Sequence, residues 1–120
     1  MAALAKVDDD TFVPCLRAQK LARGIGKFLA LTSRELDCLC LGALLHDIGK
    51  QDIPCEVLNK EDPLLPAEWD LIEQHPRRGW EYIQATELND VVKEIILKHH
   101  IWFNGKGGYP CAETYGKPCF

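Results

Sequence analysis

The spacing of hydrophobic and polar positions predicts helices along most of the chain. Apolar side chains recur at three- and four-residue intervals, the period of an α-helix with one buried face. The segments with this period are residues 8–31, 33–47, 66–74, 76–83 and 91–100, with a short helical turn at 55–58. No segment alternates with the two-residue period of a half-buried strand. We therefore predict an all-α bundle.

The most apolar segment, residues 33–47, is expected to be the central helix. Thr32 and Glu35 have the spacing of a capping box at its start. From Leu39 to Leu45 nearly every side chain is apolar, and a helix that is apolar on all sides is normally buried. Gly49 is expected to end this helix, because glycine is common just past a helix C-terminus.

Prolines and glycines set the other predicted boundaries. Pro14 is compatible with the first predicted helix only in its first turn. His75 precedes Pro76, and a residue before proline avoids the helical region, so we expect a break at His75 and a new helix from Pro76. Residues 104–110 are rich in glycine and are predicted to form a loop.

Length, composition and charge narrow the class of protein. The 120 residues, 47% hydrophobic and 27% charged, fit one globular domain over residues 1–120. A net charge of −4 argues against a nucleic-acid-binding protein, which normally presents a basic face. No apolar run reaches the roughly 18 residues of a membrane span, and the N-terminus lacks a signal-peptide pattern. We therefore expect a cytoplasmic protein without a membrane segment.

The six cysteines do not form a recognisable metal or disulfide pattern. No two of them have the C-x-x-C spacing. We interpret them chiefly as buried free thiols, with redox or metal chemistry as the alternative. The six are Cys15, Cys38, Cys40, Cys55, Cys111 and Cys119.

The candidate chemistry lies in the histidines, which all fall at the ends of predicted helices. His46 and Asp47 are adjacent at the end of the central helix, His75 precedes a proline, and His99 and His100 end the last helix. Taken singly, each can be a capping or packed residue. Together, four imidazoles and a carboxylate suit iron, manganese, nickel, cobalt or zinc. Such an ion activates water and stabilises charge on a phosphoryl group.

These residues stand in motifs that resemble the HD-GYP branch of the HD phosphohydrolase superfamily. The HD pair alone is typical of the whole superfamily, whereas the motifs in this order are more specific. They are His46-Asp47-Ile48-Gly49-Lys50, Gln74-His75-Pro76, His99-His100 and Gly108-Tyr109-Pro110.

The resemblance implies an HD-domain helical bundle with a metal site between helix ends, often holding iron or manganese, that hydrolyses cyclic di-GMP. It implies that His46, His75, His99 and His100 bind metal, that Asp47 bridges two ions, and that Lys50 contacts the phosphate. It also associates the Gly-Tyr-Pro loop with regulation and with partners such as a diguanylate cyclase domain.

Two departures from the family pattern change the expected metal content. Pro14 stands where the family has a metal-binding histidine, three residues before Arg17. The family's last metal-binding aspartate, after the signature loop, has no counterpart before Phe120, so we expect a domain incomplete at its C-terminus. By resemblance one ion keeps four ligands and the other keeps only two. The four are Asp47, His75, His99 and His100, and the two are His46 and Asp47.

Three functions follow from this pattern. The leading hypothesis is a metal-dependent phosphohydrolase that resembles cyclic di-GMP phosphodiesterases and acts on a cyclic dinucleotide or another phosphoester. The first alternative is a catalytically impaired HD-GYP-like module that binds a nucleotide or a partner in signal transduction. The second is a broader HD nucleotide phosphohydrolase, against which the Gly108-Tyr109-Pro110 motif counts. A helical domain with unrelated histidines is disfavoured, because all four histidines fall on motif positions.

Overall fold

The protein is built from helices, as predicted. The computed structural model describes residues 9–111, 114 and 116, and the side chains from residue 13 onward in that range. Its elements are α2 (Asp9–Phe28), α3 (Ser33–Leu45), the 3-10 helix η1 (Ile48–Asp52), α4 (Cys55–Leu58), α5 (Pro66–Glu73), α6 (His75–Ile83) and α7 (Asp90–Lys98). The β pairing in the described part of the chain is one isolated bridge between Ile101 and Gly108. The all-α prediction is therefore confirmed.

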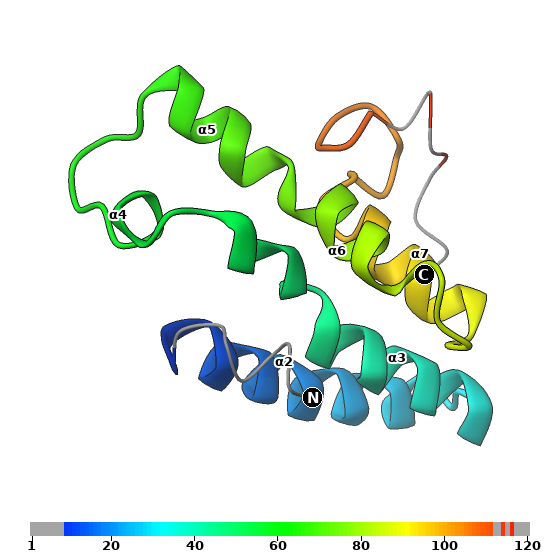
Figure 1. Ribbon diagram of the computed structural model, residues 1–120. Coiled ribbons are helices and arrows are strands. Elements are labelled where there is room, and N and C mark those ends of the chain that lie inside the picture. Colours follow the sequence, from blue (N-terminus) through cyan, green and yellow to red (C-terminus); the bar gives the residue numbers. More distant parts are fainter. Residues whose placement is uncertain (1–8, 112–113, 115, 117–120) are drawn as a thin grey trace.

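Helix α3 is the central element. Helices α2 and α3 run antiparallel and side by side, and α7 packs against α3 from the other side (Figure 1). Helix α6 packs against both η1 and α7, which brings the C-terminal end of α3 near the ends of α6 and α7. The core cluster between these elements consists of Cys15, Cys38, Leu44, Leu45, Ile48, Ile83, Val92 and Ile96.

The ends of α2 differ from the prediction. The helix stops at Phe28, because Ala30 has a left-handed φ of 56° and the N–H groups of Ala30 and Leu31 bond back to the carbonyls of Lys27 and Gly26. This is a Schellman motif with alanine at the position usually held by glycine. Pro14 lies at the sixth helical position, so its expected place in the first turn is wrong.

Helix α3 begins as predicted and ends earlier. The Thr32 hydroxyl accepts the backbone N–H of Glu35 at 3.2 Å, as an N-cap does. The helix ends at Leu45 rather than at Asp47, and Asp47 has non-helical φ and ψ of −100° and 13°. The prediction that Gly49 ends this helix is wrong, because α3 ends four residues earlier and Gly49 has no left-handed φ. Gly49 instead lies buried in η1, where a Cβ would come within 1.9 Å of the His75 carbonyl oxygen.

Two further predictions need correction. The break between α5 and α6 falls at Gln74, and His75 is the first residue of α6. The expectation of buried thiols holds for Cys15, Cys38 and Cys40 and is wrong for Cys55 and Cys111, which are exposed. All five are free, and Cys119 lies outside the described residues. Within the described ranges, no helix combines the length and apolar character needed to cross a bilayer.

Candidate metal centre

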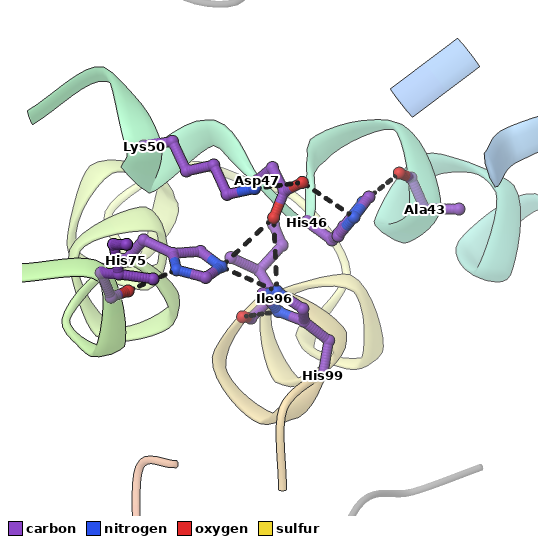
Figure 2. A network of polar contacts seen from close by, with 8 residues as sticks. Ala43, His46, Asp47, Lys50, His75, Ile96 and His99 are labelled. Atoms are coloured by element: carbon purple, nitrogen blue, oxygen red, sulfur yellow. Dashed lines mark hydrogen bonds and ion pairs between the residues drawn. The ribbon is translucent and has the colours of Figure 1, made fainter. Parts of the chain in front are cut away.

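Three helix ends meet in the interior and bring the predicted site residues together. His46 is the C-cap of α3, and Asp47 follows it at the start of η1. His75 begins α6, and His99 is the C-cap of α7. Figure 2 shows their side chains pointing toward the Asp47 carboxylate from these separate elements. His75 is 1% exposed and Asp47 is 9% exposed, so the centre is largely shielded from water.

The Asp47 carboxylate lies at the middle of this cluster, and its two oxygens face different groups. Oδ1 lies 3.2 Å from His75 Nε2 and 3.5 Å from His99 Nε2. Oδ2 lies 3.2 Å from His46 Nε2 and 3.2 Å from Lys50 Nζ. Side chains at adjacent positions of an ideal helix diverge by about 100°. His46 and Asp47 can meet because the chain leaves the helix between them.

Backbone carbonyls fix the orientation of three imidazole rings. His46 Nδ1 donates to Ala43 O at 2.5 Å, His75 Nδ1 to Ile72 O at 2.6 Å, and His99 Nδ1 to Ile96 O at 2.8 Å. A carbonyl oxygen only accepts, so Nδ1 carries the proton in each ring. The lone pair of the neutral ring is then on Nε2, directed at the Asp47 carboxylate. Metal-binding histidines are commonly oriented by such a hydrogen bond from the second nitrogen.

The arrangement of lone pairs fits a cation. His75 Nε2 and His99 Nε2 are 3.1 Å apart, and both face Asp47 Oδ1. In the neutral tautomers these three atoms are all acceptors, so they cannot hydrogen-bond to one another. A proton or a metal ion among them removes the conflict. Asp47, His75, His99 and His100 each offer one ligand atom within 4.8 Å of the others.

The electrostatics of the cluster favour an ionised Asp47 carboxylate and neutral rings at His99 and His100. Burial would raise the pKa of Asp47, but its close contacts with the His46, His75 and His99 rings outweigh burial and hold this pKa far below its usual value. Burial lowers the pKa of His99, and it lowers the pKa of His100 to about 4 with help from the neighbouring histidines. For His46, burial is outweighed by the contact with Asp47, so its pKa is raised.

His100 is held by the loop that carries the Gly-Tyr-Pro motif. The ring of Tyr109 stacks on that of His100 with centroids 4.5 Å apart, and the Tyr109 N–H donates to the His100 carbonyl at 3.2 Å. Gly108 has a φ of 85°, and a Cβ there would come within 1.9 Å of the same carbonyl oxygen. The motif therefore needs glycine at this position, and its tyrosine covers one face of a candidate ligand.

Cys15 is a candidate ligand that the sequence analysis did not assign. Its side chain, from α2, is 0% exposed. Cys15, His46 and Asp47 each offer one ligand atom within 4.8 Å of the others. Burial, and secondarily the Asp47 charge, raise the pKa of the Cys15 thiol to about 11. The available signal was its position next to Pro14, where the resemblance places a histidine.

A cleft of about 890 Å³ lies beside the centre, between the Gly-Tyr-Pro loop and helices α5 and α6. Tyr109 lines the cleft and also stacks on His100, so this ring connects the cleft to the centre. Both acidic and basic side chains line the cleft, namely Asp70, Glu73, Arg77 and Lys106. Their mixed charge does not by itself select an anionic ligand.

Comparisons with known proteins agree with the geometry. A family profile described as HD domain matches residues 4–114. A cyclic di-GMP phosphodiesterase of Vibrio cholerae is 32% identical over 98% of this chain and 27% of its own length. A cyclic di-GMP phosphodiesterase of Pseudomonas aeruginosa is 29% identical over 92% of this chain and 27% of its own length. A 3'3'-cGAMP-specific phosphodiesterase of V. cholerae is 35% identical over 67% of this chain and 16% of its own length. The chain thus spans about a quarter of the first two relatives and less of the third.

Proposed function

Since the chain belongs to the HD domain family, we propose that it is a metal-dependent phosphodiesterase domain acting on cyclic di-GMP or a related cyclic dinucleotide. The predicted resemblance to HD phosphohydrolases is confirmed, and the names of the relatives agree with the HD-GYP branch. The observation that carries the proposal is the group of Asp47, His75, His99 and His100, each of which offers one ligand atom within 4.8 Å of the others.

These four residues would hold the first ion. Imidazole and carboxylate donors suit iron(II) or manganese(II), which we propose as the native metals, and they also accept zinc, nickel or cobalt. A bound ion supplies an activated water and offsets the negative charge of the phosphodiester. The carbonyl bonds at Nδ1 keep Nε2 of His75 and His99 directed inward, so the protein orients these two ligands before a metal binds.

The side chains around the ion have separate roles. Asp47 accepts contacts on both oxygens, which suits the bridging role that the resemblance assigns to it. Lys50 is 27% exposed and lies on a flexible stem 3.2 Å from Asp47 Oδ2. We propose that it turns from Asp47 to a substrate phosphate when the Asp47 charge is offset by metal. A lysine ammonium is a mobile point charge suited to such a contact.

A second candidate function is a non-catalytic signalling module, and one surface feature favours it. Trp102 and Phe103, next to the signature loop, are 59% and 80% exposed. Large exposed aromatic side chains are typical of contact sites for other proteins. A diguanylate cyclase-type partner is proposed for this surface, on the resemblance alone. We also propose a cytoplasmic location, because the free thiols of the described residues suit a reducing compartment.

Anaerobic turnover of cyclic di-GMP with iron(II) or manganese(II) tests the proposed activity. We expect the parent to release the linear dinucleotide or GMP and Asp47→Asn to release neither, because the amide removes the central charge. Asp52→Asn is the matched control, since Asp52 is an exposed carboxylate of the same 3-10 helix, outside the cluster. Turnover by Asp47→Asn would contradict the site. A parent that binds metal without turnover would assign the chain to the signalling class.

A further inference from the structure

We propose that Cys15 is the third protein ligand of a second metal subsite, which it forms with His46 and Asp47. The subsite would take a divalent ion with affinity for sulfur, zinc or iron(II) in preference to manganese(II). The inference rests on the proposed function in one respect, because it shares Asp47 with the first ion's ligand set. By resemblance to the family, the second ion would have two protein ligands, His46 and Asp47. With Cys15, the second ion would have three.

The distances between the donors support a common ion. One ligand atom from each of Cys15, His46 and Asp47 lies within 4.8 Å of the other two. Metal bonds to sulfur and to imidazole nitrogen are about 2.3 and 2.0–2.1 Å long, so two donors on one ion lie at most roughly 4.4 Å apart. A small inward movement is therefore enough to bring all three donors onto one ion.

The packing of α2 on α3 explains why position 15, and not position 14, supplies the donor. Adjacent helical residues point about 100° apart. Pro14 is exposed, whereas Cys15 is fully buried against the C-terminal end of α3 and belongs to the core cluster. The helix therefore turns the thiol toward His46 and Asp47, and the substitution by proline at position 14 does not leave the subsite without a ligand from α2.

Burial alone does not distinguish Cys15 from the other buried cysteines. Cys38 and Cys40 are 8% and 2% exposed, comparable to Cys15. In the described part of the chain, neither belongs to a group of side chains able to hold an ion. Cys40 is therefore a matched reference, since it is a buried free thiol on α3 that belongs to neither candidate metal-binding group of the described residues.

The donor set determines which ion is preferred. Sulfur is a soft ligand that selects zinc and other thiophilic metals, whereas manganese and magnesium favour oxygen ligands. His46 is already oriented by its bond to the Ala43 carbonyl, which leaves Nε2 as its metal-binding nitrogen. An ion that binds a thiol displaces the thiol proton to solvent, so the bound form is a thiolate. The first site has no sulfur among its four ligands, so the two sites differ in metal preference.

Cobalt(II) titration of the full chain under anaerobic conditions tests the proposal. Cobalt is the probe because its thiolate complexes have a charge-transfer absorption in the near ultraviolet, whereas its imidazole and carboxylate complexes do not. We expect the parent to bind two ions and to gain this band. Cys15→Ser should bind one ion fewer and lose the band. Cys40→Ser should bind two ions and keep the band. Thermal unfolding of the variants shows whether they are folded.

The outcomes separate this inference from the proposed function. A parent that binds one ion without the band, and loses that ion on His99→Ala, overturns the Cys15 subsite and leaves the first site intact. A parent that binds no cobalt overturns both. Retention of the band in Cys15→Ser also overturns the inference, because another thiol must then be the ligand. If Cys15→Ser does not fold, the parent alone decides, since bound cobalt without the band contradicts a thiolate ligand.

Discussion

Gly49→Ala is predicted to damage both stability and metal binding, because η1 and α6 approach each other at this glycine. A Cβ at position 49 would lie 1.9 Å from the His75 carbonyl oxygen and 2.7 Å from the Gly79 nitrogen. Contacts below 3.0 Å are essentially never made by real Cβ atoms, so the backbones must separate by about 1.1 Å. Both neighbours are backbone atoms, which cannot move aside as a flexible side chain can.

The cost of this separation follows from the packing. Inserting a methyl group into a close-packed site costs about 1–3 kcal/mol, and a backbone clash belongs at the upper end. Alanine restricts the unfolded chain more than glycine and recovers roughly 0.4–1 kcal/mol. We expect the free energy of unfolding to fall by about 2 kcal/mol and the melting temperature by roughly 10 °C. Displacement of His75 should also weaken metal binding, because His75 Nε2 lies only 3.2 Å from Asp47 Oδ1.

Urea unfolding and metal titration of Gly49→Ala measure these two effects. Gly24→Ala is the matched control, because a Cβ at position 24 meets nothing within 4 Å and the residue lies inside α2. The control should gain about 0.5–1 kcal/mol, the usual advantage of alanine in a helix interior. If Gly49→Ala is as stable as the parent and binds metal equally well, the close approach of η1 to α6 is refuted.

Two further predictions concern a helix end and the pH dependence of stability. Ala30→Gly should raise the free energy of unfolding by about 1 kcal/mol in urea denaturation, because it relieves the left-handed alanine after α2; a loss of stability would contradict the assigned φ. In chelator-treated protein, stability should fall as the pH drops from about 6.5 toward about 4, because the unfolded chain protonates His100 at its ordinary pKa while the folded protein resists until about 4. His100→Asn should reduce this slope, and an unchanged slope in thermal unfolding between these pH values would count against the buried, neutral His100.

The sequence was sufficient for the helical fold and for most of the residues that the structure gathers around Asp47. Apolar runs with helical spacing end at His46, His75 and His99, and buried helix ends of this kind lie together in a small bundle. Which oxygen of Asp47 faces which histidine was not predictable, because it depends on the departure of Asp47 from helical φ and ψ. Helix η1, which begins directly after Asp47, packs on α6, a contact between segments distant in the sequence that local patterning does not predict.

The role of Cys15, the constraint on Gly49 and the conformation of Ala30 were not predicted from the sequence. Each depends on which way a helix faces or on backbone geometry. The motif comparison pointed to position 14, whereas the turn of α2 directs position 15 inward. Gly49 was interpreted as a helix terminator from its place after an apolar run. Its actual constraint is the His75 carbonyl, which belongs to another helix. Ala30 gave no signal at all, since a left-handed alanine is uncommon.

The stacking of Tyr109 on His100 has a thermodynamic consequence for the whole domain. The Tyr109 ring contacts a candidate metal ligand on one side and lines the cleft beside α5 and α6 on the other. If His100 binds a metal ion, a molecule that binds in the cleft and displaces this ring is expected to change the free energy of metal binding. Linkage then requires the reverse effect with the same factor, so metal occupancy would change the affinity of the cleft for that molecule. In this way the Tyr109 ring would couple metal binding at the centre to ligand binding in the cleft.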